Sequence, residues 1–230
     1  MKHDFVPGNA EVIAKQKELD NLICALGENR LPLHKSCIEG TRTTILQEIE
    51  DEIKNINAPN VIWIRGSPGV GKSALAASIV NRLVDQKRHV IPFQFDCTQS
   101  TVTANALWRT VACDLARLHL SLQSHLTQST QGHSSSDIDR LFKLLIEEPL
   151  STLGDDVPHE ELPVIVIDAL DKYGGLRHDE SGKEDLWSLL RTLKRWIQAD
   201  HLKKFKVVIT SRPEDLLFRA TSTQDAALPR

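Results

Sequence analysis

Eight consecutive residues have the types and spacing of a loop that wraps a phosphate group. They are Gly66, Ser67, Pro68, Gly69, Val70, Gly71, Lys72 and Ser73, and they fit the pattern G-x-x-x-x-G-K-[ST]. The glycines let backbone N–H groups turn toward an anion, Lys72 reaches the β- and γ-phosphates, and the Ser73 hydroxyl binds Mg²⁺. The alternative, an ordinary glycine turn, is disfavoured because a β-branched run precedes the loop and a helix-forming run follows it.

Three more residues follow apolar runs and could act on the same phosphates. Asp168 comes directly after such a run, where a carboxylate holds Mg²⁺ through water as the partner of Ser73; alternatively, it only starts a turn. Asp171 is a candidate to orient or deprotonate an attacking water. Arg212 is a candidate to contact a γ-phosphate with its planar fork, or else a surface arginine paired with Glu214.

The elements that must position these residues alternate along the chain. Strands are predicted over residues 61–64, 90–95, 162–167 and 205–210, with helices after the first, second and third. Pro92 places the second strand near an edge, because proline donates no ladder hydrogen bond. The alternation predicts an α/β fold, a three-layer αβα parallel sheet whose ligand lies at the carboxyl ends of the strands.

Helix boundaries are indicated by capping residues. A first helix is predicted over residues 10–26. Thr44 and Gln47 have the form of a capping box for a second helix, whose apolar face would carry Ile45, Ile49 and Ile53. Asp137 is the predicted N-cap of a helix that continues to Ile146.

Composition predicts a single cytoplasmic domain. The chain has 230 residues and a net charge of −3, so we expect no field that attracts nucleic acid, and Lys203–Lys206 is interpreted as a solvated strand entrance. The 4 cysteines are scattered without metal-ligand spacing and are predicted to be free thiols. We predict no membrane segment and no signal peptide.

Taken in order, these motifs resemble the NACHT NTPase domain of fungal STAND proteins, a branch of the ASCE-type P-loop NTPases. The resemblance covers roughly residues 36 to 216. It is carried by Gly66–Ser73, Asp168–Asp171 and Thr210–Glu214, with similar segments at Cys37–Arg42 and Phe142–Leu150.

The resemblance implies a nucleotide-operated switch that binds ATP or ADP with Mg²⁺ and acts in non-self recognition or cell death. Asp168 would bind the metal, Arg212 the γ-phosphate, and Thr41 and Arg42 would lie near the base and ribose. Protein partners or a homo-oligomer are implied. So are an N-terminal helical segment over residues 1–57 and an NTPase core over residues 58–230.

Two departures from the family pattern leave the activity open. Lys172 stands where relatives carry a glutamate, so the chain is either a slowly hydrolysing ATPase or a non-catalytic, nucleotide-stabilised interaction module or decoy. A small-molecule phosphotransferase is a third alternative that draws only on the phosphate loop. The chain is also predicted to stop before the fifth strand of a 5-1-4-3-2 sheet, so the phosphate-loop strand would be an edge that favours self-association unless residues 1–35 cover it.

Overall fold

The computed structural model describes residues 17, 36–38, 40–96, 103–119, 122–123, 125–126, 137–153, 157–173 and 180–213. Three features predicted from the sequence lie outside these ranges: nearly all of the first helix, Glu214, and the thiols of Cys24 and Cys97. Within them, neither Cys37 nor Cys113 forms a disulfide.

Four parallel strands form the sheet, in the order β1-β4-β3-β2. The strands are β1 (Val61–Arg65), β2 (Val90–Gln94), β3 (Val164–Asp168) and β4 (Val207–Ser211). Because all pairs are parallel, every carboxyl end lies at the same edge of the sheet. The predicted α/β fold class is confirmed, and β2 lies at an edge of the described sheet, as Pro92 indicated.

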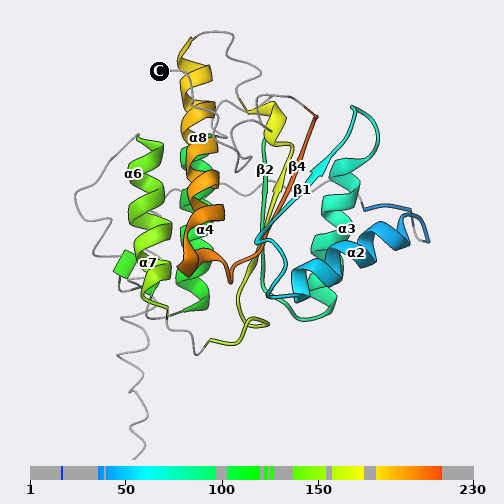
Figure 1. The fold of residues 1–230 in the computed structure, drawn as a ribbon, viewed down its shortest axis with the longest axis horizontal. Helices are drawn as coiled ribbons and strands as arrows, with labels where there is room; N and C mark the ends of the chain where they lie inside the picture. Colours follow the sequence, from blue (N-terminus) through cyan, green and yellow to red (C-terminus); the bar gives the residue numbers. More distant parts are fainter. Residues whose placement is uncertain are drawn as a thin grey trace, which may run out of the picture.

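Helices cover both faces of the sheet (Figure 1). The helices are α2 (Thr43–Lys54), α3 (Lys72–Asp85), α4 (Ala104–Leu118), α6 (Ile138–Phe142), α7 (Glu148–Ser151) and α8 (Glu180–Gln198). Short turns of other helix types are η1 (Lys143–Glu147, π), η2 (Leu170–Lys172, 3₁₀) and η3 (Asp200–Leu202, 3₁₀). Within the described part of the chain, no helix has both the length and the apolar character that crossing a bilayer requires.

Strand β3 shows how the alternating direction of strand side chains divides the core in two. Val164 and Val166 pack toward α2 and α3, whereas Ile165 and Ile167 pack toward α4, α6 and α8. All five residues of β3 are buried, which is the reason that the strand is continuously apolar up to Asp168. Burial on both faces fixes the register of β3, and this places Asp168 at the carboxyl edge of the sheet.

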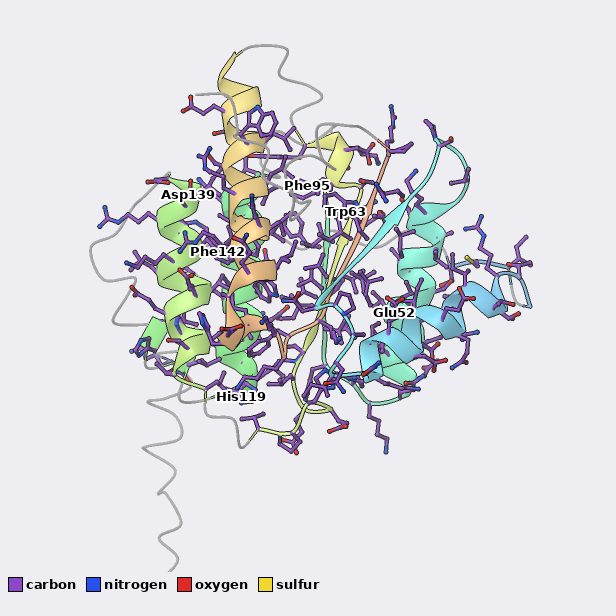
Figure 2. The ribbon with its side chains drawn as sticks, in the orientation of Figure 1. Glu52, Trp63, Phe95, His119, Asp139 and Phe142 are labelled. Atoms are coloured by element: carbon purple, nitrogen blue, oxygen red, sulfur yellow. The ribbon has the colours of Figure 1, made fainter. Side chains whose placement is uncertain are left out.

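The larger core contains an aromatic cluster around Phe142, which Figure 2 labels between the helices on that face. The rings of Trp108 and Phe142 meet edge to face, with centroids 4.8 Å apart, and Trp108 stacks on Trp196 at 6.1 Å. Trp196 in turn contacts Phe205, just before β4. The cluster therefore fixes α4, α6 and α8 relative to β4, the strand that Arg212 follows.

The helix predicted from Ile138 to Ile146 is correct in its start and wrong in its continuity. Asp137 Oδ1 accepts hydrogen bonds from the amides of Asp139 and Arg140, as an N-cap should. After Phe142 the helix widens into the π turn η1, and α7 follows. The physical reason is Pro149, which has no N–H and whose ring would clash with the carbonyl four residues earlier in a regular helix.

The second predicted helix, α2, starts without the capping box. Its N-cap is Arg42 in the left-handed region at φ 56°, with no side-chain cap hydrogen bond, and Gln47 Nε2 donates to Asp51 instead. Its buried apolar residues are Leu46, Ile49 and Ile53, while Ile45 is 40% exposed. The buried face therefore carries Leu46 and not the predicted Ile45, because positions 46, 49 and 53 lie on one side of the helix. Helix α2 packs on α3, and the predicted division of the chain at residue 57 stays a prediction.

The interpretation of Lys203–Lys206 as a solvated strand entrance is wrong for its last residue. Lys206 is 1% exposed, and its ammonium donates to the carbonyls of Asn55 (2.7 Å), Ala58 (2.8 Å) and Pro59 (3.2 Å). These carbonyls belong to the turn between α2 and β1, where the Asn55 carbonyl also accepts from the Ala58 amide. Lys206 therefore ties that turn to the start of β4.

Candidate functional site

The predicted phosphate loop connects β1 to α3 at the carboxyl edge of the sheet. Gly69 and Gly71 have φ angles of 79° and 80°, a conformation that other residues rarely adopt. The two left-handed glycines turn the chain sharply, and α3 begins immediately afterwards at Lys72. The free N–H groups of the first turn of α3, which includes Ser73, therefore face the end of the loop, where an anion is stabilised.

Lys72 holds the loop from inside. Its Nζ donates to the carbonyl oxygens of Gly66 at 2.7 Å and Ser67 at 3.0 Å. The Gly66 amide donates to Ser211 O at 3.3 Å, which extends the pairing of β1 with β4 by one residue. The loop is thus fixed to the strand that ends beside Arg212.

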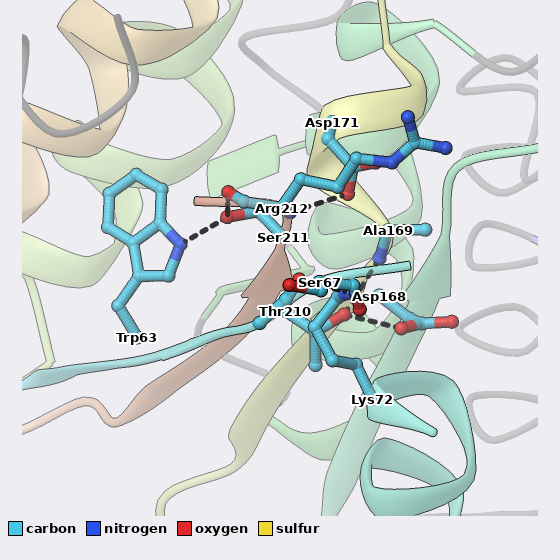
Figure 3. A network of polar contacts seen from close by, with 10 residues as sticks. Trp63, Ser67, Lys72, Asp168, Ala169, Asp171, Thr210, Ser211 and Arg212 are labelled. Atoms are coloured by element: carbon cyan, nitrogen blue, oxygen red, sulfur yellow. Dashed lines mark hydrogen bonds and ion pairs between the residues drawn. The ribbon is translucent and has the colours of Figure 1, made fainter. Parts of the chain in front are cut away.

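Asp168 is the last residue of β3 and is 1% exposed; Figure 3 shows it beside Thr210. The Thr210 hydroxyl donates to Asp168 Oδ1, and Gln94 Nε2 donates to Oδ2 at 3.1 Å. Thr210 Oγ1 also accepts from the amide of Ala169 at 2.9 Å, which holds that residue at a φ of 59°. The left-handed turn at Ala169 directs the chain into η2 and toward Asp171.

Asp171 and Arg212 are paired. The Arg212 backbone amide donates to Asp171 Oδ1 at 3.0 Å, and Arg212 Nε lies 3.0 Å from Asp171 Oδ2 (Figure 3). The side chain of Asp171 is 7% exposed and that of Arg212 is 50% exposed. Arg212 is therefore paired with the carboxylate of η2, and its contact with a γ-phosphate stays a prediction.

These elements enclose a cavity of about 670 Å³. Its lining residues are Pro68, Gly69, Gly71, Lys72, Ser73, Ala74, Ala169, Asp171, Lys172, Thr210 and Arg212. Three of them are cations, namely Lys72, Lys172 and Arg212, and the lining carboxylate, Asp171, is already bonded to Arg212. The chemistry of the lining therefore favours a multiply charged anion.

The donor set near the loop fits a hydrated Mg²⁺. Within the described residues, no group of three or more His, Cys, Asp or Glu side chains is arranged to hold a metal ion. Mg²⁺ does not require such a cage, because it keeps most of its waters and takes one or two protein oxygens together with phosphate. The Ser73 hydroxyl and the Asp168 carboxylate are oxygens of this kind, and each Asp168 oxygen has a second lone pair beyond the bond that it accepts.

Thr41 and Arg42 do not line this cavity. Thr41 donates from Oγ1 to Ile38 O at 2.6 Å and lines a separate cavity of about 230 Å³ beside α3. The Arg42 guanidinium lies over the phosphate loop and donates to Gly71 O at 2.7 Å and to Val70 O. A Cβ at Gly71 would lie 2.7 Å from Arg42 Nη2, so the pairing requires glycine there.

The structure thus brings together, around one cavity, the phosphate loop from β1, Asp171 after β3 and Arg212 after β4, with Asp168 beneath them. Sequence reasoning missed Gln94, which supports Asp168. The available signal was its place as the last polar residue of β2, since Gln94 is directly in register with Asp168. It also missed the bond from Trp63 Nε1 to Ser211 Oγ, 2.8 Å long, which joins side chains of neighbouring strands.

Solved structures similar to the chain include Drosophila ORC bound to DNA and the Aeropyrum pernix ORC1 protein in complex with DNA. The first has a TM-score of 0.43 and 16% identity, covering 96% of this chain and 49% of that chain. The second has a TM-score of 0.47 and 15% identity, covering 87% of this chain and 46% of that chain. The chain therefore spans about half the length of the proteins that it matches. Comparison with curated proteins gives no significant match.

The prediction that nucleic acid is not a partner requires correction. It was based on the net charge of the whole chain, whereas both of these similar structures are complexes with DNA. Net charge reports on the field around the whole molecule and says nothing about a local surface. Nucleic acid is therefore not excluded as a partner of this chain.

The family model described as Nephrocystin 3, N-terminal matches residues 40–212. This range is about three quarters of the chain and contains the phosphate loop, Asp168, Asp171 and Arg212. It begins at the turn before α2 and ends at the last residue of the site. The chain, with its parallel sheet and phosphate loop of the P-loop NTPase type, belongs to the Nephrocystin 3, N-terminal family.

Proposed function

We propose that the chain is an ATP-binding switch module of the NACHT type, which binds Mg-ATP or Mg-ADP and transmits the nucleotide state to protein partners. The observation that carries the proposal is the cationic cavity of about 670 Å³ into which the phosphate loop and Arg212 both open. The motif order shared with fungal STAND proteins supports a role in signalling, such as non-self recognition or cell death.

Each site residue has a proposed task. The amides of Gly66–Ser73 would hold the phosphates, and Lys72 would move from the loop carbonyls to the β- and γ-phosphates. Ser73 and Asp168 would hold the metal, which neutralises phosphate charge when it is bound. Arg212 would contact the γ-phosphate. Thr41 and Arg42 stay proposed contacts of the base and ribose.

The first experiment measures nucleotide affinity by calorimetry for the wild-type chain and for Lys72→Ala. We expect the variant to lose affinity for Mg-ATP on the order of 10- to 100-fold, the free energy of hydrogen bonds from one charged group. Lys203→Ala is the matched control, because Lys203 is exposed at the amino end of β4 and its ion pair with Asp200 is a surface pair. Equal affinity in Lys72→Ala and Lys203→Ala would contradict the proposal.

The switch would act through association. Residues that contact the γ-phosphate differ from those that contact the diphosphate, so the two nucleotides would stabilise different conformations. Partners would be other protein chains or further copies of this one. Sedimentation of the chain with Mg-ADP and with a nonhydrolysable ATP analogue tests this, and identical profiles with both nucleotides would contradict it.

A second candidate function is a nucleotide-stabilised interaction module without turnover. It is favoured by Lys172, which adds a cation to the cavity where relatives carry a carboxylate, and by the engagement of Asp171 with Arg212. Steady-state phosphate release separates the two functions, since multiple turnovers per chain would exclude the second. For an inactive wild-type chain, we expect Lys172→Glu to gain measurable turnover, because it restores a carboxylate beside the water site.

A further inference from the structure

The two side chains of the Asp171–Arg212 pair differ in their exposure to solvent. Asp171 Oδ1 accepts a hydrogen bond from the Arg212 backbone amide at 3.0 Å, and Asp171 Oδ2 forms an ion pair with Arg212 Nε, also at 3.0 Å. The carboxylate is 7% exposed, whereas half of the arginine side chain is exposed. Asp171 is therefore the buried support of the pair, and Arg212 is the group that meets the cavity.

This geometry is poorly suited to a general base. A base must present an accessible lone pair to a water molecule within hydrogen-bond reach. Both oxygens of Asp171 are instead engaged by one residue, Oδ1 by the Arg212 backbone amide and Oδ2 by the Arg212 guanidinium.

The same geometry is well suited to orienting an arginine. Asp171 contacts the backbone amide and Nε of Arg212, so it does not occupy the edge of the guanidinium that Nη1 and Nη2 form. Neither of these two nitrogens donates a hydrogen bond within the described residues. That edge is a planar pair of donors with the spacing of two phosphate oxygens. Because two points are held, rotation about the side chain is restricted before any ligand binds.

The main chain of Arg212 is held from the other side as well. Its carbonyl accepts from Ser211 Oγ at 2.9 Å, and Ser211 Oγ accepts from Trp63 Nε1 at 2.8 Å (Figure 3). Ser211 is 0% exposed. The arginine is thus fixed at its amide, its carbonyl and its Nε, and a group fixed in this way loses little entropy when it binds.

We propose that Asp171 is a positioning residue: it holds Arg212 so that the guanidinium distinguishes a nucleoside triphosphate from a diphosphate. The inference rests on the proposed function, because it needs nucleotide in the cavity. A diphosphate ends before it reaches Arg212, so Asp171 contributes to affinity only for the triphosphate, and only through Arg212.

The test compares the dissociation constants of Mg-ADP and of Mg-bound adenylyl imidodiphosphate, which is not hydrolysed. The measured quantity is the dissociation constant of Mg-ADP divided by that of the triphosphate analogue. For the full chain we expect this ratio to exceed one. In Arg212→Ala it should fall about tenfold, as for loss of one charged hydrogen-bonding group. Asp171→Ala should lower the ratio to the same extent with the ADP affinity kept within about twofold. The double variant should fall no further, because the two residues act as one unit.

Asp139→Ala is the matched control, since it removes the exposed Asp139–Arg191 ion pair between α6 and α8. It should leave the ratio unchanged. Should Asp171→Ala not fold, Asp171→Asn keeps the shape of the side chain and sets an amide group against one of the two donors. A second readout needs no nucleotide: hydrogen exchange at the Arg212 amide should accelerate in either variant at residue 171.

The outcomes separate this inference from the proposed function. No binding of either nucleotide to the folded wild-type chain refutes both. If the wild-type chain binds nucleotide but the ratio is unchanged in Asp171→Asn or Asp171→Ala, the inference alone is overturned. The same holds if the ratio is unchanged and turnover is lost, because that is the result expected when a general base is removed. Independent, additive effects of the residue 171 and 212 substitutions would also overturn it.

Discussion

Thr210 is the residue on which the metal side of the site depends. Its hydroxyl donates to Asp168 and accepts from the amide of Ala169, and Thr210 is 0% exposed. One hydroxyl therefore fixes both the carboxylate at the tip of β3 and the left-handed turn that follows it. A buried group that satisfies two others is costly to remove, because both are left without a partner.

We expect Thr210→Val to lower the free energy of unfolding by about 2 kcal/mol, since the shape is kept while a buried amide and a buried carboxylate each lose a hydrogen bond. The dependence of nucleotide binding on Mg²⁺ should weaken as well. Urea unfolding and a Mg²⁺ titration measure the two effects.

Thr192→Val is the control for this prediction. Thr192 is equally buried, but its hydroxyl donates to Leu189 O within helix α8, where that carbonyl also belongs to the helix. The free energy of unfolding of Thr192→Val should fall by less than about 1 kcal/mol. A similar loss in both variants would show that the Thr210 hydroxyl has no special role.

At this scale the sequence predicted which residues would meet, but not how they would pair. Asp168 and Arg212 follow buried strands, and parallel strands end at one edge, so their meeting with the phosphate loop follows from the pattern. The pairing of Arg212 with Asp171 depends on the turn at Ala169, whose positive φ is not indicated by an alanine. For that reason the sequence suggests Glu214, which is nearer along the chain, as the partner of Arg212.

Among the elements, α2 depends on contacts that are distant in sequence. Glu50 in α2 is 4% exposed and accepts hydrogen bonds from Arg82 of α3 and from Gln86, the C-cap of α3, each at 2.8 Å. Burial raises the pKa of Glu50, but the Arg82 and Gln86 hydrogen bonds outweigh it and hold that pKa below its ordinary value. The carboxyl end of α2 is held by Lys206, which donates to Asn55 O, and so this helix is tied to β4 as well as to α3.

We expect Lys206→Met to lower the free energy of unfolding by about 1–3 kcal/mol, because the carbonyls of Ala58 and Pro59 lose the ammonium donor and that of Asn55 keeps only the Ala58 amide. The loss is limited, since burial of the ammonium, which lowers the pKa of Lys206, is itself unfavourable. Hydrogen exchange in residues 55–60 should accelerate. Lys203→Met, on the same segment but exposed, should change the stability by less than about 0.5 kcal/mol. Equal stability of both variants would contradict a structural role for Lys206.

The sequence predicts the four strands to within two residues at each end because their apolar runs are continuous, and those of β3 and β4 are buried on both faces. The sequence does not predict the start of α2 or the π turn. The first is set by Arg42, whose partners lie 28 and 29 residues away on the phosphate loop, and the second by strain around Pro149. Such effects arise from tertiary contacts and local sterics, which periodicity does not record.

Seen as a whole, the molecule has different chemistry at the two ends of its sheet. The carboxyl end carries the exposed, cationic cavity. The amino end carries half-buried basic groups, among them Arg88, which donates to the carbonyl of His159 at 3.1 Å. Nε2 of His119 and Nε2 of His159 are buried without a hydrogen-bond partner in the described structure. A neutral imidazole tolerates such a position, whereas a charged one does not.

Stability should therefore fall as the pH drops below about 6.5, the ordinary pKa of histidine. Burial lowers the pKa of His159, with further lowering by Arg88 and Lys206 that Glu160 partly opposes. Burial also lowers the pKa of His119. The nearby His89 lowers this pKa further, whereas the charge of Glu161 raises it in part. With the folded-state pKa below the unfolded value, the unfolded chain binds more protons between the two values, so protonation favours unfolding there; above the unfolded value this contribution to stability is complete.

Urea unfolding midpoints at pH 7.5, 6.5 and 5.5 measure the effect. Carboxylates titrate below this window, so the fall should be due mainly to histidine. The double variant His119→Gln/His159→Gln should show a flatter dependence on pH, because glutamine carries no ionisable group. His201→Gln, at an exposed position, should keep the wild-type slope. If the double variant keeps that slope as well, the buried imidazoles do not link folding to pH, and protonation elsewhere in the chain is responsible.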